Sequence, residues 1–172
     1  SGDLYIYGSF LVGTSTENWS YATDFDGAPL SGASRRAVDV FFVTDASSTI
    51  SLFDTGTLNV IGETGATTTI QATGTGQYSF TVSGGTINAN YYSFQDLDQS
   101  GVNFSGAPSI TSLDDGEYVQ ALNGASLITL ASTSLDANAS LEIFRNHFDA
   151  NGFSGGINVN LDATTTNSWK YS

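Results

Sequence analysis

The sequence predicts an all-β fold of stacked strands, and three observations support this fold class. Apolar and polar residues alternate with a period of two in several short stretches, which is the spacing of a half-buried strand and not of a helix. These stretches are rich in β-branched and aromatic residues and are bounded by Gly, Asn and Asp, which favour turns. They recur every roughly 20 to 30 residues, a period typical of proteins whose units bury their faces against their neighbours.

The predicted strands follow one another along most of the chain. In the stretch YSFTV, Tyr78, Phe80 and Val82 fall on one face, and the hydroxyl-bearing residues between them fall on the other. The other predicted strands are Leu4–Leu11, Val38–Val43, Leu58–Ile61, Ile87–Phe94, Val102–Phe104, Leu127–Leu130 and Ile157–Leu161. The predicted turns are Asp26–Gly27, Gly84–Gly85, Asp115–Gly116, Asn151–Gly152 and Gly155–Gly156.

The stretch SLEIFRNHFDANGF supports two interpretations. Leu141, Phe144 and Phe148 have the spacing of one face of a short helix, and Gly152 is placed to end it. Leu141 and Ile143 also alternate as they would in a strand. Both interpretations remain open for this segment.

Length and composition predict one extracellular domain over residues 1–172. Hydrophobic residues make up 40% of the chain, so it can form a core, but charged residues make up only 12%. The absence of Cys rules out disulfides and thiolate metal sites. Because the chain also lacks Met, we expect Ser1 to begin a processed product or an excised segment. Few basic residues and no oxidisable sulfur favour a location outside the cell or on its surface.

The net charge limits the classes of partner. Seventeen acidic and 4 basic residues give a formal charge of −13, which repels the phosphate backbone of nucleic acids. Anionic membrane surfaces are disfavoured for the same reason. No apolar run approaches the roughly 20 residues of a spanning helix, so we expect no membrane insertion. Three glycosylation sequons begin at Asn18, Asn103 and Asn138, in a composition where such tripeptides arise by chance.

Four segments carry a resemblance to a known architecture: TLNVIG, YSFTVSGGTINANYYSF, GVNFSGAPSITSL and GGINVNLD. Each joins short strands through Gly or Asn corners. In this they resemble the coils of right-handed parallel β-helix domains in large secreted and surface proteins of bacteria. The resemblance covers residues 57–161 clearly and the less regular residues 3–56 more weakly. It implies a parallel β-helix (β-solenoid), with an antiparallel β-sandwich or jelly roll as the alternative.

The resemblance implies more than one class of function. Adhesins, passenger domains and fibre proteins share this architecture, and so do polysaccharide lyases and hydrolases, so the fold leaves activity open. In such a fold, equivalent side chains of successive coils stack. We therefore predict an internal aromatic ladder formed by Tyr78, Phe80, Tyr91, Phe94 and Phe104. The alternative for these aromatic residues is a sugar-binding platform.

Two acidic turns are candidate calcium sites. The stretch DLDQSG places Asp96, Asp98 and Ser100 as the first ligands of an EF-hand loop would lie, but Ala107 replaces the Glu that would close it. A looser cage around Asp96 and Asp98 remains a candidate, as does one at Asp24 and Asp26. The alternative at each site is an acidic turn in water. If the chain is an enzyme instead, carboxylate pairs such as Asp96 with Asp98 would cleave a polysaccharide.

Other chemistry is less well supported. The single histidine, His147, lacks the partners of a Ser-His-Asp site, so we expect no catalytic role for it. A carbohydrate-binding module would use Trp19, Tyr21 or Trp169 at its surface.

The sequence therefore predicts a non-enzymatic structural or adhesive segment of a bacterial surface protein or self-assembling fibre. Unpaired strand edges would allow self-association by β-augmentation. The alternatives are a carbohydrate-binding module and a polysaccharide-cleaving enzyme. The candidate joining elements are the aromatic strands at the two chain ends, through Leu4, Tyr5, Ile6, Tyr7, Trp169 and Tyr171.

Overall fold

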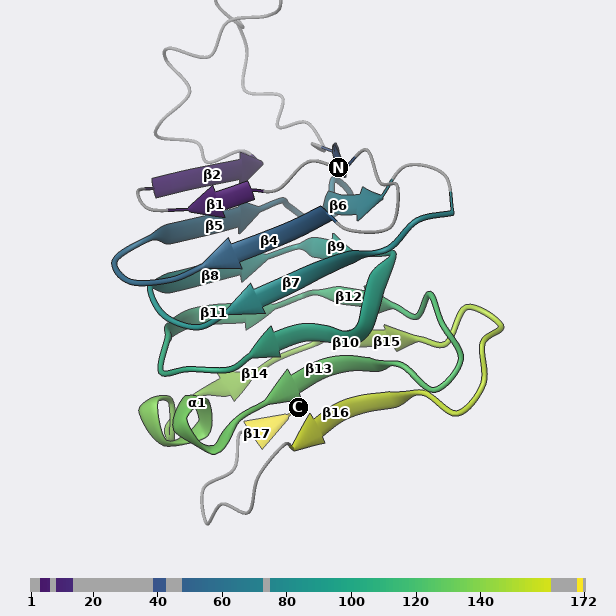
Figure 1. Cartoon of the computed structure of the whole chain (residues 1–172). Coiled ribbons are helices and arrows are strands. Elements are labelled where there is room, and N and C mark those ends of the chain that lie inside the picture. The colour runs from purple at the N-terminus through teal and green to yellow at the C-terminus, as the bar shows by residue number, and fades with distance from the viewer. Residues whose placement is uncertain are drawn as a thin grey trace, which may run out of the picture.

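The chain folds as a parallel β-solenoid, in which short strands wind around a common core (Figure 1). The structure, a computed structural model, describes residues 4–6, 9–13, 39–42, 48–72, 75–161 and 170–171, and describes side chains for 49–72 and 75–161. Every strand pair among these residues is parallel. The predicted all-β parallel β-helix is therefore confirmed, and the antiparallel alternative is wrong.

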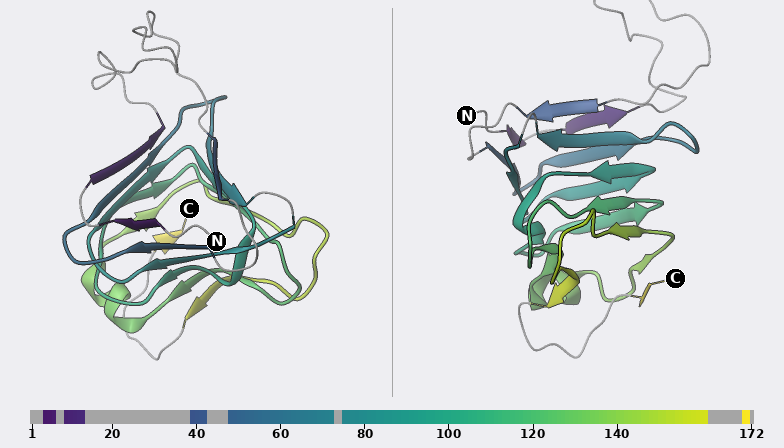
Figure 2. Two further views of the ribbon diagram at one scale, coloured as in Figure 1. Left: turned by 45° about the horizontal axis from the view of Figure 1, so that its top comes forward. Right: turned by 90° about the vertical axis from the view of Figure 1, so that its right-hand side faces the viewer.

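Three sheets form the sides of the coil (Figure 2). Sheet 1 contains β1 (Leu4–Ile6), β4 (Ser48–Leu52), β7 (Tyr78–Val82), β10 (Leu97–Phe104), β13 (Ser126–Leu130) and β16 (Ile157–Leu161). Sheet 2 contains β2 (Ser9–Gly13), β5 (Thr57–Ile61), β8 (Thr86–Asn90) and β11 (Ser109–Asp114). Sheet 3 contains β3 (Asp39–Phe42), β6 (Thr68–Ala72), β9 (Tyr92–Phe94), β12 (Glu117–Val119) and β15 (His147–Asp149). A further pair joins β14 (Glu142–Ile143) to β17 (Lys170–Tyr171).

The core consists of columns of apolar side chains at matching register positions of successive coils. Alternation along each strand sends every second residue inward, and parallel pairing places these residues above one another. One column in sheet 1 contains Ile50, Phe80, Val102 and Ile128. The next contains Leu52, Val82, Phe104 and Leu130. All eight side chains are buried, so each coil is held chiefly by the coils on either side of it.

Aromatic rings fill the widest part of the core. The prediction of an internal aromatic ladder is confirmed in part: Tyr78, Phe80, Phe94 and Phe104 are buried, and the rings of Phe80 and Phe94 meet edge-on, while Phe104 lies in register with Val82 and Leu130. It is wrong for Tyr91, which is only partly buried and adopts a left-handed backbone conformation with φ of 50°. At this corner the alternation of inward and outward side chains along β8 ends, and it begins again in β9 shifted by one residue. Tyr92 therefore enters the core, where its ring lies 4.7 Å from that of Phe94.

The segment with two interpretations forms strands. β14 and β15 lie within it, so the helical interpretation is wrong. The helix that the structure does contain, α1 (Ser132–Ala137), comes just before this segment, between β13 and β14. Its Leu135 is buried, and the Ser134 hydroxyl donates hydrogen bonds to the carbonyls of Phe104 (3.0 Å) and Gly106 (2.5 Å). None of the described helical segments is long and apolar enough to cross a membrane.

Candidate functional site

Three residues that share a rare backbone conformation stack at the corner between sheets 2 and 3. Tyr91, Asp115 and Arg145 have φ values of 50°, 53° and 55°, and each immediately precedes or lies close to a strand of sheet 3. Backbone hydrogen bonds link them from coil to coil. The Tyr91 amide donates to the Asp114 carbonyl at 3.2 Å, and the Asp115 amide donates to the Phe144 carbonyl at 2.9 Å. The corner therefore presents one side chain per coil along the outside of the solenoid.

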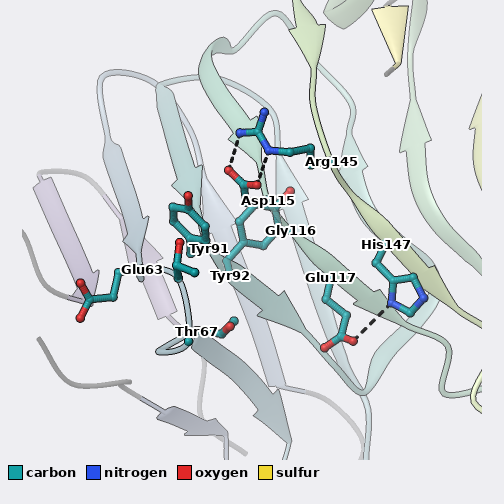
Figure 3. Close-up of a pocket in the computed structure, with 11 residues that line it drawn as sticks. Glu63, Thr67, Tyr91, Tyr92, Asp115, Gly116, Glu117, Arg145 and His147 are labelled. Carbon is teal, nitrogen blue, oxygen red and sulfur yellow. Dashed lines mark hydrogen bonds and ion pairs between the residues drawn. The ribbon is translucent and has the colours of Figure 1, made fainter.

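A loop from the neighbouring coil makes this corner concave. Between β5 and β6 the chain forms a short turn, in which Glu63 and Ala66 exchange backbone hydrogen bonds of 3.1 and 2.9 Å. Gly62 is needed where this loop begins, because a Cβ there would overlap the Tyr91 carbonyl oxygen. Loop and corner together line an open pocket of about 350 Å³ (Figure 3). It is lined by Glu63, Thr64, Gly65, Thr67, Tyr91, Tyr92, Asp115, Gly116, Glu117, Arg145 and His147.

An ion pair forms one wall of the pocket. The Arg145 guanidinium donates from Nε and Nη2 to the two carboxylate oxygens of Asp115, at 2.5 and 2.7 Å. The bidentate hydrogen bond to Arg145 lowers the pKa of Asp115, and the same hydrogen bond raises the pKa of Arg145. The Asp115 side chain is 15% exposed and that of Arg145 is 65% exposed. Asp115 is thus a fixed anion, whereas most of the guanidinium faces solvent.

Glu117 and His147 form the opposite wall of the pocket, at the end of a chain of polar side chains that begins outside the lining. Gln95 Nε2 donates to Ser93 Oγ at 3.0 Å, and Ser93 Oγ donates to Glu117 Oε2 at 3.0 Å. The other carboxylate oxygen of Glu117 lies 3.4 Å from His147 Nδ1. Hydrolysis by a catalytic serine needs an imidazole that accepts the proton of the serine hydroxyl. Here the Glu117 carboxylate lies between the Ser93 hydroxyl and the His147 imidazole. The arrangement holds side chains in place and does not activate Ser93.

The floor of the pocket is a buried hydrogen-bonded network. The Tyr92 and Tyr118 hydroxyl oxygens are 2.7 Å apart, and the Tyr92 hydroxyl also donates to Asn146 Oδ1 at 3.1 Å. Asn146 Oδ1 accepts the Gly116 amide at 2.9 Å as well. Burial, then the neighbouring Tyr118, raises the pKa of Tyr92 well above its usual value. The Tyr92 phenol therefore stays protonated and forms a rigid polar floor for the pocket.

The carboxylates predicted to bind calcium or to act as an enzymatic pair have partners in the protein. The Ala72 amide donates to Asp96 Oδ2 at 3.2 Å. Asp98 accepts from Ser79 Oγ at 2.5 Å and from the Ser100 amide at 2.9 Å. Burial raises the pKa of Asp96, although the bond from Ala72 opposes this. Within the described part of the chain, no group of three or more His, Cys, Asp and Glu side chains is placed to hold a metal ion. Calcium at Asp96 and Asp98 stays a prediction.

Most of the other predicted site residues lie outside the described side chains. Leu4, Tyr5 and Ile6 form β1 and Tyr171 belongs to β17, but only their backbone is described. The remaining predicted residues lie outside the described residues: Tyr7, Trp19, Tyr21, Asp24, Asp26 and Trp169.

A second candidate surface lies at the end of the solenoid that carries β16. Register places Val159 below Ile128 and Leu161 below Leu130, in the two apolar columns of sheet 1. The core residues of these columns are buried, but Leu161 is 55% exposed and Ile157, at the start of the same strand, is 47% exposed. β16 is the last strand in the order of sheet 1, and no described strand pairs with its outer edge. Exposed apolar side chains thus lie beside a strand edge with which no strand of the described residues pairs.

Sequence reasoning missed the corner pocket because its residues come from separate coils. Asp115 and Arg145 are 30 residues apart in the chain, and neither belongs to a motif. The indications in the sequence were the predicted turn at Asp115–Gly116 and the single histidine, His147. Comparisons with protein-family models, with curated proteins and with solved structures found no match for this chain.

Proposed function

We propose that this protein is an extracellular structural segment whose solenoid elongates by end-to-end stacking of copies. The observation that carries the proposal is the apolar end at β16, with Ile157 and Leu161 exposed at positions that are buried in the coils above. A side chain of this size gains about 1.5–3 kcal/mol when it is fully buried. A further coil stacked on β16 would supply that burial and would pair its backbone edge.

The occupant that we propose for this end is the β1 end of a second copy. β1 is the first strand of sheet 1 and β16 the last, so their outer edges face opposite directions along the stack. In register, Leu4 and Ile6 occupy the positions of Ile50 and Leu52, in the same two columns as Val159 and Leu161. A copy added in parallel would continue both columns with aliphatic residues. Such head-to-tail contacts do not close and so build a filament.

The pocket chemistry supports a role in binding or construction more than catalysis. A general acid in glycoside cleavage needs a raised pKa, but the pKa of Asp115 is lowered by Arg145. Asp114 accepts hydrogen bonds from the Phe144 amide and from Ser112 Oγ, at 2.9 and 2.8 Å. Both carboxylates therefore serve as acceptors for protein groups. The adhesive and cell-surface parts of the proposal rest on composition.

Charge placed at the β16 end tests the proposal. We expect the wild-type chain to form filaments in electron micrographs and to sediment faster as its concentration rises. The double variant Ile157→Lys, Leu161→Lys should remain monomeric, because stacking would bury two ammonium groups. The matched control is Asn158→Lys, Asn160→Lys, which adds the same charge to the alternate positions of the same strand and should still assemble. Wild-type protein that stays monomeric at every concentration, or a first variant that assembles normally, would overturn the proposal.

A further inference from the structure

We propose that the corner pocket binds a neutral sugar ring of a glycan, a role separate from end-to-end stacking. The pocket lies on the side of the solenoid, across β9, β12 and β15, and shares no residue with β16. Its volume of about 350 Å³ falls at the lower end of the range for small-ligand sites, roughly 300–1,000 Å³. A single ring with its substituents is a ligand of suitable size.

The pocket offers donors and acceptors side by side. Two N–H groups of Arg145 are directed at Asp115, which leaves the other guanidinium N–H groups on the exposed side of the side chain. On the opposite wall, Glu117 is an acceptor, and the His147 ring turns its Nδ1 toward Glu117 (Figure 3). Sugar hydroxyls both donate and accept hydrogen bonds, so adjacent hydroxyls match such a mixed lining. A phosphate only accepts and an ammonium only donates, and each would leave half of these groups unmatched.

The charge of the lining also selects against anions. Three carboxylates, Glu63, Asp115 and Glu117, line the pocket, against one permanent cation, Arg145. A uronate or phosphate would be repelled by this excess of negative charge. A neutral ring meets no such barrier.

Tyr91 supplies an aromatic surface at the pocket. Its left-handed backbone is unusual for a bulky residue, yet hydrogen bonds to both neighbouring coils hold it there. The Thr68 amide donates to its carbonyl at 3.0 Å, and its own amide donates to Asp114. The ring is partly exposed between the loop at Glu63 and Thr67 and the Asp115–Arg145 pair (Figure 3). An exposed phenol ring is suited to pack against the C–H face of a sugar.

The binding experiment uses isotope-labelled protein and a panel of oligosaccharides. Cello-, malto-, xylo- and manno-oligosaccharides are the neutral probes, oligogalacturonate is the anionic probe, and chitosan oligosaccharide is the cationic probe. The Ile157→Lys, Leu161→Lys variant is titrated beside the wild type, so that failure to assemble and failure to bind are read separately. We expect at least one neutral probe to shift the amide signals of Tyr91, Gly116 and Glu117, with the same affinity in both proteins.

Two variants locate the binding to the pocket. Tyr91→Asn removes the ring, and Arg145→Asn removes the guanidinium, while Asn tolerates the left-handed conformation at both positions. Each should weaken binding about tenfold, as expected for the loss of a ring contact or of a bidentate donor. The matched control is Asn151→Gly, which alters another left-handed corner, with φ of 48°, outside the pocket lining and should bind as the wild type does.

Three results would overturn the proposal. The first is that no neutral probe shifts the pocket signals. The second is that only the cationic or the anionic probe does so, which would assign the pocket to another ligand class. The third is that a neutral sugar binds but keeps its full affinity in both Tyr91→Asn and Arg145→Asn, which would place binding on another surface.

Discussion

Phe94 is the residue at which the aromatic part of the core converges. Its ring lies 5.3 Å from that of Phe80, 4.7 Å from that of Tyr92 and 5.8 Å from that of Tyr118, measured between centroids. Two of these contacts are edge-on, the geometry that aromatic pairs prefer. Phe80 and Tyr92 belong to the same coil as Phe94, whereas Tyr118 lies in the next coil and Ile70, the register partner of Phe94, lies in the preceding one. The loss of Phe94 therefore weakens contacts within its coil and with both neighbouring coils.

We predict that Phe94→Ala lowers the free energy of unfolding by about 3–5 kcal/mol, because a large buried ring is replaced by a cavity. Urea denaturation followed by circular dichroism measures the change. Phe153→Ala is the matched control, since Phe153 lies in a loop and is 36% exposed, and it should cost less than about 1 kcal/mol. Equal losses in the two variants would contradict the core described for this coil.

Ionisation of Asp96 and ionisation of Asp115 have opposite effects on the stability of the fold. Burial raises the pKa of Asp96 in the folded state, so ionisation opposes folding. The contribution of Asp96 to the free energy of unfolding is fully present when the pH is below its pKa in the unfolded chain. It is lost as the pH rises through its higher pKa in the folded protein. The pKa of Asp115 is lowered, so its contribution is present above the unfolded pKa and is lost as pH falls through the folded pKa.

We predict that Asp96→Asn stabilises the protein at pH 7, because Asn is neutral, tolerates the left-handed φ of 58° and keeps an acceptor for the Ala72 amide. The gain should be at most about 0.5 kcal/mol, since the carboxyl keeps contact with water. It should vanish in acid, where the wild-type carboxyl is also neutral. Urea midpoints from pH 3 to pH 7 test this, and a loss of stability at pH 7 would refute it.

The same variant tests the calcium prediction. If Asp96 and Asp98 hold calcium, adding the ion should raise the urea midpoint of the wild type and leave that of Asp96→Asn unchanged. If the wild type gains nothing at millimolar calcium, the predicted site is wrong.

At the scale of elements, one side chain ties α1 to the coil above it. Asn138 Oδ1 accepts the Ile110 amide at 3.0 Å, and its Nδ2 donates to the carbonyls of Pro108 and Ser134, at 2.9 and 2.8 Å. Asn138 thus closes the C-terminal end of α1 and fixes the start of β11. Because this asparagine also begins a sequon, a glycan on its Nδ2 would compete with these bonds.

We predict that Asn138→Ala destabilises the protein by about 1–3 kcal/mol, because it removes three hydrogen bonds and leaves backbone groups without them. Ser140→Ala removes the same sequon but leaves Asn138 intact, and it should change stability by less than about 0.5 kcal/mol. Thermal unfolding of protein from a host that does not glycosylate separates the two effects. Similar melting temperatures for both variants would show that the Asn138 side chain does not hold α1 to the neighbouring coil.

Strands could be predicted from the sequence where large apolar residues alternate without interruption. β7 and β16 were found in this way, with the bounds that the structure shows, and β13 was found within a residue of its ends from a short run of apolar residues. β6 was missed because one of its inward positions is Thr68, whose hydroxyl is satisfied by the Ile61 carbonyl at 3.0 Å. α1 has one large buried apolar residue and no side-chain cap, so it leaves little pattern in the sequence.

The error at Tyr91 has a definite physical cause. Alternation is a property of one strand, and a left-handed corner between two strands shifts the inward positions by one residue. Counting through Ile87–Phe94 as a single strand therefore placed the wrong tyrosine inside. The pocket escaped prediction for a related reason, since coils of unequal length bring its residues together and no spacing in the sequence encodes that alignment.

At the scale of the whole molecule, stability should decrease toward the end that carries β16. Strands such as β7 and β10 pair on both edges, whereas β16 pairs only with β13 among the described strands. Each coil contacts mainly its neighbours, so the last one can open without the rest.

We predict that hydrogen exchange at the amides of β16 is at least tenfold faster than at those of β7 and β10 in dilute solution. Mass spectrometry after timed exchange would resolve these strands. If copies stack, the difference should shrink as concentration rises, and it should persist in Ile157→Lys, Leu161→Lys. Uniform exchange along the solenoid would instead indicate a single cooperative unit.

Parallel stacking also determines how the solenoid would respond to a pulling force. The backbone hydrogen bonds between coils run along the stack, so tension on that axis opens one row of bonds at a time and does not shear many together. Paired residues of successive coils are 30 apart in the chain at Glu117 and His147. One opened coil would therefore release roughly 100 Å of extended chain. A tether of this kind would absorb mechanical work coil by coil while the remaining coils kept their fold.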